Sequence, residues 1–234
     1  MVKTQISLSR CLTGIHSALA SWRRTAATTV RRVVFASSNH VMGGYKDDAT
    51  RGPGSVHPHS APRVGTLPRN PEQAAASGDA VAYAAAKLAG ERLARTLAAL
   101  HGATTSFVVL RIGWCQPGEN RPATLSAAGV PGDVAGVVPQ GEETAAAEGE
   151  REDELWYKRM WLSNRDFARY FDAALRLVAP SADPPEGEGA GGVHRHVGKG
   201  FVLINAMSNN RGAKWNLDET AAWTGVASED DALA

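Results

Sequence analysis

The residues best suited to acid–base chemistry in this sequence are Tyr83 and Lys87, which are separated by three alanines. On a helix, side chains four residues apart project from the same face. A nearby ammonium group favours the ionised phenol and lowers the pKa of the tyrosine, which suits it to act as a general base near neutral pH. The same spacing also arises by chance, and a solvent-exposed pair is the alternative.

A polar run that directly follows an apolar one supplies the hydroxyl groups that such a base would need. Residues 33–36 are all apolar, and residues 37–40 read Ser-Ser-Asn-His. The apolar run predicts a buried strand of a parallel sheet. Because ligands of open α/β sheets bind beyond the carboxyl ends of the strands, we expect a hydroxyl here to hydrogen-bond a substrate oxygen while Tyr83 removes its proton. For Asn39 and His40, a hydrogen-bonded turn at the end of the strand is the alternative.

The elements that must position these residues follow an α/β order. A helix is predicted for residues 83–100, and further buried strands are predicted for residues 107–112 and 201–206. Strand, long helix and strand in alternation are typical of a doubly wound, mostly parallel sheet. Other helices are expected at residues 12–24, at 163–178, where Ser163 and Asp166 form a capping box, and at 218–224.

Two stretches interrupt this order. Residues 46–81 are rich in Pro, Gly, His and Ala, and residues 128–154 contain a run of acidic side chains. Neither shows hydrophobic periodicity, so we expect inserted irregular loops within one domain that spans residues 1–234, and a flexible turn at 180–192. Two His-x-His pairs, at 57/59 and 194/196, have no Cys or carboxylate at ligand spacing, so the sequence predicts no metal site.

Composition excludes several classes of protein. The chain has 234 residues, of which 43% are hydrophobic, and a formal net charge of +1, so no global field attracts nucleic acid. No apolar run approaches the roughly 20 residues of a membrane span. The two cysteines provide no disulfide framework, which favours a cytoplasmic location. No acidic residue precedes Asp47, so the Arg-rich start is either a transit peptide or a helix of the fold.

Together, these strings resemble the extended short-chain dehydrogenases/reductases of the NAD-dependent epimerase/dehydratase family. That family combines a strand ending in Ser-Ser with a Tyr-x-x-x-Lys helix. The strings at residues 33–40, 110–113, 160–167 and 208–211 are similar to those of its uronate dehydrogenase-like branch. The resemblance implies an NAD(P)-binding Rossmann-like fold, NAD as cofactor, and a sugar or sugar acid as substrate. It is also compatible with assembly of the chain into a homo-oligomer.

The resemblance also implies a role for each matching residue. Ser38, five positions before Gly43, corresponds to the catalytic serine. Tyr83 corresponds to the acid/base, and Lys87 binds the nicotinamide ribose and tunes the tyrosine, so both also contact the cofactor. Substrate binding falls to three residues, Asn39, His40 and Arg121. An arginine suits the carboxylate of a sugar acid because its guanidinium can bind it with two hydrogen bonds.

One departure from the family pattern concerns the cofactor. No Gly-x-Gly-x-x-Gly or Gly-x-x-Gly-x-x-Gly opens a strand-to-helix turn in this sequence, and Trp114 stands where the family has a serine. We therefore expect an N-terminal truncation that lacks the first βαβ units. Three functions remain open: NAD-dependent oxidation of a sugar or sugar acid, epimerisation or dehydration of a sugar nucleotide, and an inactive fragment that cannot bind the dinucleotide.

Overall fold

The computed structural model describes residues 30–65, 71–125, 152, 154–181 and 197–234, with the backbone alone for 71–80. The helix expected at residues 12–24 lies outside the described residues. So do most of the stretches 128–154 and 180–192.

A four-stranded, mostly parallel sheet forms the centre of the described fold. Its strands are β1 (Arg32–Ser38), β2 (Ser106–Ile112), β3 (Val197–Gly198) and β4 (Phe201–Ala206), in the order β1-β2-β4-β3. Strands β1, β2 and β4 are parallel, whereas β3 pairs antiparallel with β4. The three strands predicted from apolar runs are thus confirmed, as is the α/β class. Strand β3 was not predicted, because two residues are too few to show a pattern.

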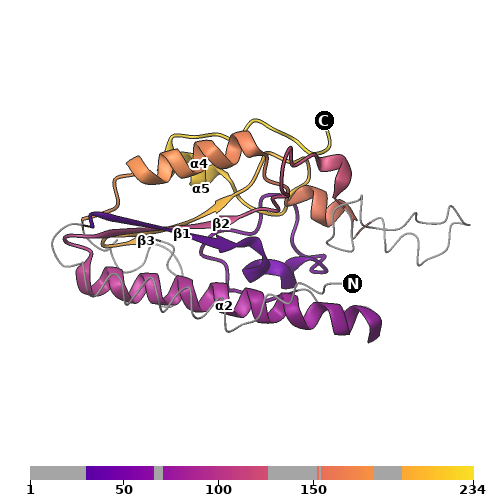
Figure 1. The fold of residues 1–234 in the computed structure, drawn as a ribbon, viewed down its shortest axis with the longest axis horizontal. Coiled ribbons are helices and arrows are strands. Elements are labelled where there is room, and N and C mark those ends of the chain that lie inside the picture. Colours follow the sequence, from indigo (N-terminus) through magenta and orange to yellow (C-terminus); the bar gives the residue numbers. More distant parts are fainter. Residues whose placement is uncertain (1–29, 66–70, 126–151, 153, 182–196) are drawn as a thin grey trace, which may run out of the picture.

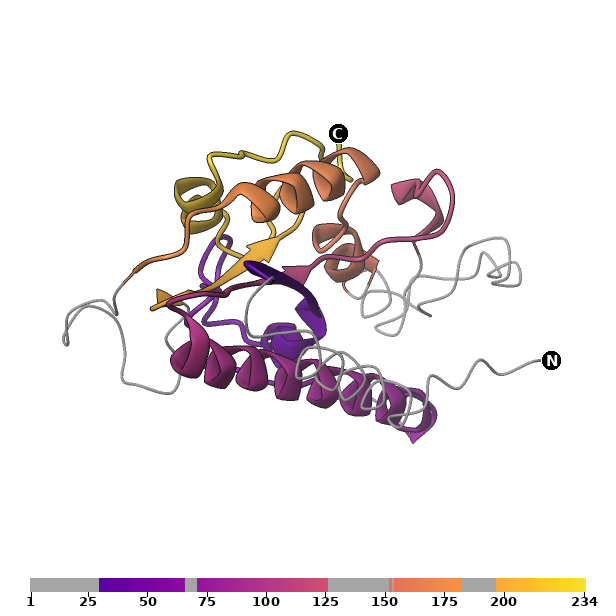
Figure 2. The same ribbon diagram turned by 60° about the vertical axis from the view of Figure 1, so that its left-hand side comes forward.

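Helices cover both faces of this sheet (Figures 1 and 2). The long helix α2 (Pro71–His101) lies on one face, and α4 (Asn164–Arg176) and α5 (Asp218–Thr224) lie on the other. Side chains of β2 alternate between the two layers, as successive residues of a strand must. Those facing α2 pack with its alanines: Phe107, Val109, Ala94, Ala98. Those facing α4 pack with its buried residues: Val108, Leu110, Tyr170, Ala174.

The helices differ from the sequence prediction mainly at the start of α2. This helix begins at Pro71, so residues 71–81 are helical and were wrongly predicted to be part of an irregular loop. Proline suits the first position of a helix, and the alanines at 74–76 favour its continuation. Two other predictions are confirmed: α5 has the predicted bounds, and the Ser163 hydroxyl caps α4 by accepting a hydrogen bond from Asp166 N at 2.9 Å. The other half of the predicted capping box is not formed, because Ser163 N donates to Ser208 Oγ at 3.0 Å instead. Residues 152 and 154 are also helical, although they belong to the stretch predicted to be irregular.

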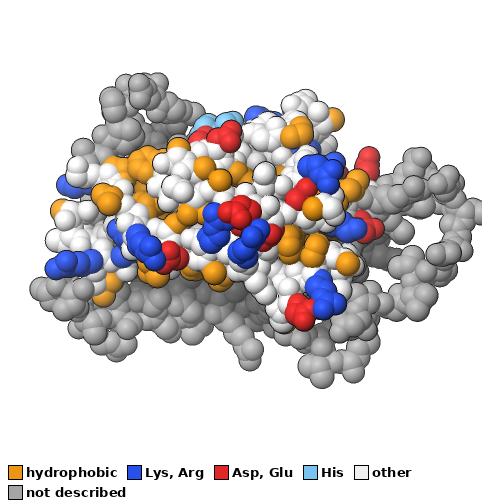
Figure 3. Space-filling view, turned by 90° about the horizontal axis from the view of Figure 1, so that it is seen from above, with side chains coloured by type: hydrophobic (Ala, Val, Ile, Leu, Met, Phe, Trp, Pro, Cys, Tyr) orange, Lys and Arg blue, Asp and Glu red, His pale blue; other side chains and the backbone are white. Residues whose placement is uncertain are grey.

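The outer surface of the α4 and α5 layer carries charges of both signs. Figure 3 views the molecule from this side and shows basic and acidic side chains next to one another. Residues of this layer form the ion pairs Arg176–Asp172 and Arg165–Asp230, each with an N···O distance of 2.5 Å. Among the described helices, none combines the length and the apolar character needed to cross a membrane.

Candidate active site

Helix α2 directs Tyr83 and Lys87 to the carboxyl end of β1. Lys87 Nζ donates a hydrogen bond of 2.7 Å to the carbonyl oxygen of Ala36. The same ammonium nitrogen lies 5.5 Å from the centre of the Tyr83 ring and 5.4 Å from that of Phe35. The prediction that the tyrosine and the lysine share one helix face and point toward the end of this strand is therefore confirmed.

The polar run after β1 folds into a turn that hydrogen-bonds to itself. Ser38 caps the 3-10 helix η1 (Asn39–Tyr45), because its hydroxyl accepts from His40 N at 3.2 Å. Ser38 Oγ also lies 3.2 Å from Asn39 Oδ1 and 3.2 Å from His40 Nδ1. His40 Nδ1 lies 2.9 Å from Asn39 Oδ1. This is the hydrogen-bonded turn considered as an alternative, and it holds the Ser38 hydroxyl at the end of the strand.

His40 connects this turn to the tyrosine on α2. Its ring meets the ring of Tyr83 edge to face at 5.8 Å and lies 6.0 Å from that of Trp114. Burial lowers the pKa of His40 to about 4, so the imidazole is neutral near pH 7. A neutral imidazole has one donor and one acceptor nitrogen, and can therefore hydrogen-bond a hydroxyl in either sense. Trp114, in turn, packs against Tyr157 with the ring centres 5.3 Å apart.

Arg121 is placed differently from the other predicted residues. Its side chain is 70% exposed and forms an ion pair with Glu119. It precedes the short 3-10 helix η2 (Pro122–Thr124) and provides no side-chain cap to it. In the described structure Arg121 thus belongs to an ion pair at the surface. The other predicted site residues are brought together at the end of β1: Ser38, Asn39, His40, Tyr83, Lys87.

A buried ion pair next to this cluster was missed by the sequence analysis. Glu91 lies one turn after Lys87 on α2 and receives two hydrogen bonds from Arg111 of β2, at 2.9 and 2.8 Å. The two side chains are only 4% and 2% exposed. Ser37 donates a third hydrogen bond to Glu91, at 2.6 Å, and Arg111 also donates to the carbonyl of Pro58, at 3.1 Å. Together they tie α2 to both β1 and β2.

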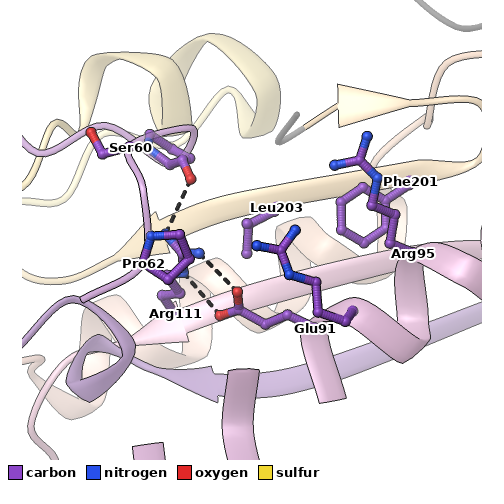
Figure 4. A pocket seen from close by; sticks show the side chains of 9 residues that line it. Ser60, Pro62, Glu91, Arg95, Arg111, Phe201 and Leu203 are labelled. Atoms are coloured by element: carbon purple, nitrogen blue, oxygen red, sulfur yellow. Dashed lines mark hydrogen bonds and ion pairs between the residues drawn. The ribbon is translucent and has the colours of Figure 1, made fainter. Parts of the chain in front are cut away.

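Figure 4 shows the guanidinium of Arg111 and the carboxylate of Glu91 facing one another beneath a loop. That loop contributes Ser60 and Pro62 to a small surface pocket. Helix α2 and strand β4 supply further lining residues: Arg92, Arg95, Phe201, Leu203. The two serines at the end of β1 therefore have separate tasks. Ser37 anchors the helix through Glu91, and Ser38 belongs to the turn that faces Tyr83.

Comparison with known proteins adds no relative: no family model, curated protein or solved structure matches this chain. The open, mostly parallel sheet is compatible with a Rossmann-like fold. The resemblance to the short-chain dehydrogenases stays a prediction made from the sequence strings.

Proposed function

We propose that this chain is an extended short-chain dehydrogenase/reductase that oxidises a sugar or sugar acid with NAD as the electron acceptor. The observation that supports this most is the grouping at the end of β1. The Lys87 ammonium bonds to the last carbonyl before the Ser-Ser pair, and the Tyr83 ring meets His40. A candidate base, a cation close to its ring, and polar groups for a substrate oxygen thus lie within one cluster.

In this proposal each residue has one task. The phenolate of Tyr83 accepts the proton of the substrate hydroxyl as the C–H bond beside it gives up its hydride. The ammonium of Lys87 stabilises the phenolate. Ser38 and the neutral His40 hydrogen-bond the substrate oxygen. To do so, each of them gives up one hydrogen bond within the turn that they now form. With a uronate, loss of the hydroxyl proton and of a hydride from the anomeric carbon gives an aldarolactone.

The residues present fit one half of the cofactor. Tyr83 and Lys87 offer a hydroxyl and an ammonium to the nicotinamide ribose, and NAD when bound supplies the acceptor for the hydride. The pyrophosphate needs backbone N–H groups at a glycine-rich turn from a strand into a helix. The Gly-x-Gly-x-x-Gly string at 187–192 follows a Pro- and Glu-containing stretch and no predicted strand, so the sequence offers no recognisable turn of this kind. A chain that holds the catalytic residues without holding the dinucleotide is therefore the second candidate.

Calorimetric titration of NAD into the purified chain separates these two candidates. The hydrogen bonds of the nicotinamide ribose alone do not offset the cost of ordering a dinucleotide, so we expect binding no tighter than roughly millimolar. Micromolar binding would contradict the second candidate, and undetectable binding at millimolar NAD would support it.

The proposed activity is tested by NADH formation at millimolar NAD with a panel of hexuronates, neutral hexoses and UDP-sugars. We expect NADH with a uronate, and a rate at least about 100-fold lower in Tyr83→Phe, which lacks the proton acceptor. Tyr170→Phe is the matched control, because it removes a hydroxyl on the opposite face of the sheet, where it donates to Met207 O. Equal rates in the two variants would contradict the role of Tyr83. Interconversion of UDP-sugars without net NADH would instead favour the epimerase.

A further inference from the structure

Two histidines and a glutamate from distant parts of the chain meet beside the first turn of α5. His57 Nδ1 lies 2.6 Å from Glu219 Oε1, and His59 Nδ1 lies 3.6 Å from the same oxygen. One ligand atom from each of the three residues lies within 4.8 Å of the other two. The sequence shows no carboxylate at ligand spacing from this His-x-His pair, whereas the fold supplies one from 162 positions away.

A tight turn places both imidazoles on the same side of the loop. The Ser60 hydroxyl accepts from His57 N at 3.0 Å, and Ser60 N donates to His57 O at 3.0 Å. The two rings consequently stack, with centres 4.9 Å apart and planes inclined by 25°. In this arrangement the Nδ1 atoms of both rings face the same carboxylate oxygen.

The loop and the helix that carry these ligands are held together by Asn216. Its backbone N donates to Val56 O at 2.9 Å, immediately before His57. Its side-chain Oδ1 accepts from the backbone N of Glu219 at 3.1 Å. Val56 N also donates to Lys214 O at 2.7 Å, which completes a bridge between the two segments. The three side chains therefore start from a backbone that is already fixed, as a binding site requires.

We propose that His57, His59 and Glu219 bind a divalent transition-metal ion of the Zn²⁺ class. Two imidazole nitrogens and one carboxylate oxygen are the donor set of many zinc sites with an open fourth position. The side chains of His57, His59 and Glu219 are 36%, 36% and 26% exposed, so an ion and a water ligand can reach them. Mg²⁺ and Ca²⁺ are disfavoured, because they take mainly oxygen ligands.

The distances suit such an ion after a small adjustment. Metal–ligand bonds of about 2.0–2.2 Å in a tetrahedron place neighbouring donors roughly 3.4 Å apart. The His59–Glu219 distance of 3.6 Å already fits. The His57–Glu219 distance of 2.6 Å is that of a hydrogen bond, and it must lengthen by roughly 0.8 Å as the metal replaces the proton. Rotation of a partly exposed glutamate side chain provides this movement.

Metal binding would cross-link α5 to the loop that contains His57 and His59. Closing a long stretch of chain stabilises the folded state more than closing a short one, and an ion that binds only the folded state raises its stability. The loop also contributes Pro58, whose carbonyl accepts from the buried Arg111. The metal would thus fix the loop above the ion pair that anchors α2.

The test is calorimetric titration of Zn²⁺ into the whole chain, purified without a polyhistidine tag, with Mg²⁺ as a second titrant. The informative variant is His59→Ala, because it removes one ligand and keeps the His57–Glu219 hydrogen bond. Glu219→Gln replaces the charged ligand by a neutral group of the same shape. The matched control is the double variant His194→Ala/His196→Ala, which removes the other His-x-His pair of the sequence. Thermal unfolding of each protein, with and without Zn²⁺, provides a second readout.

We expect one Zn²⁺ per chain, no Mg²⁺ binding at the same concentration, and a rise in the unfolding midpoint with Zn²⁺. Affinity should fall more than about 100-fold in His59→Ala and in Glu219→Gln, since losing a ligand costs more than losing a residue that only supports one. The control should keep the site. The proposal is overturned if the unaltered chain binds no Zn²⁺, if both ligand variants bind it normally, or if the control alone loses it.

Discussion

Removing the buried carboxylate of Glu91 is expected to be among the most damaging single changes in this fold. Among the described residues, the substitution Glu91→Ala leaves the Arg111 guanidinium, 2% exposed, with only the Pro58 carbonyl and Met42 Sδ as partners. It also deprives the Ser37 hydroxyl of its acceptor. The damage therefore comes from a buried charge and a buried hydroxyl that have lost their counterpart.

The size of the effect follows from this geometry. Breaking a buried ion pair by deleting one partner costs about 3–5 kcal/mol, whereas an exposed pair contributes about 1 kcal/mol or less. Since a domain is stable by only about 5–15 kcal/mol, the variant should unfold at a much lower urea concentration. Replacing both partners by apolar residues, Glu91→Leu with Arg111→Met, should recover most of the loss, because neither charge then needs to be desolvated.

Urea unfolding monitored by circular dichroism gives the free energy of each variant. The matched control is Asp172→Ala on α4, which breaks the exposed pair with Arg176, where the side chains are 55% and 76% exposed. We expect Glu91→Ala to lose at least about 3 kcal/mol and the control less than about 1 kcal/mol. Equal losses in the two variants, or a double variant as unstable as the sum of its single changes, would show that the buried ion pair does not hold α2 to the sheet.

Three further predictions concern other contacts. The pKa of His40 is about 4 when folded against an ordinary value of 6.5, so the unfolded chain binds the extra proton and stability falls by up to about 3 kcal/mol as the pH drops from 6.5 to 4. His40→Gln should remove this part of the pH dependence in urea titrations, and an unchanged profile would contradict it. The Cys115 thiol reaches the surface, yet desolvation raises its pKa to about 11. In a Cys11→Ser background, iodoacetamide should therefore alkylate it about 10-fold more slowly at pH 8 than in urea, because the greater nucleophilicity of its thiolate offsets part of the lower thiolate fraction; similar rates would contradict this. A Cβ added at Gly90 would lie 2.4 Å from the Phe35 ring, so Gly90→Ala should lower the unfolding midpoint despite the better helix propensity of alanine, and a raised midpoint would show that the ring yields.

Elements with a local signature were predictable from the sequence. The strand at 201–206 is an almost continuous apolar run. The start of α4 is indicated by Ser163, whose hydroxyl caps the backbone N–H of the residue three positions later. Both signals depend on residues that are neighbours in the chain. The first part of α2 was missed because the neighbouring residues 46–70 are rich in turn-forming residues. The predicted loop was therefore continued too far along the chain, across the helix-favouring alanines at 74–76.

Contacts between distant residues were not predictable. The helical spacing of Tyr83, Lys87 and Glu91 was visible, but it did not show that Arg111 of another element would neutralise the glutamate. Nor could it show that Glu219 lies next to His57, because these segments are brought together by long-range backbone contacts, such as the bridge between Val56 and Trp215, that no local pattern predicts. Arg121 was selected from a resemblance alone, and its side chain lies at the surface.

The measurement that tests the proposed function most directly is the transfer of label from a hexuronate deuterated at its anomeric carbon. The chain is incubated with this substrate and millimolar NAD, and the NADH is analysed by mass spectrometry. We expect NADH that carries one deuterium, formed by the unaltered chain and by Tyr170→Phe but at least about 100-fold more slowly by Tyr83→Phe. Unlabelled NADH, no NADH at all, or transfer that proceeds equally well without the Tyr83 hydroxyl would contradict it.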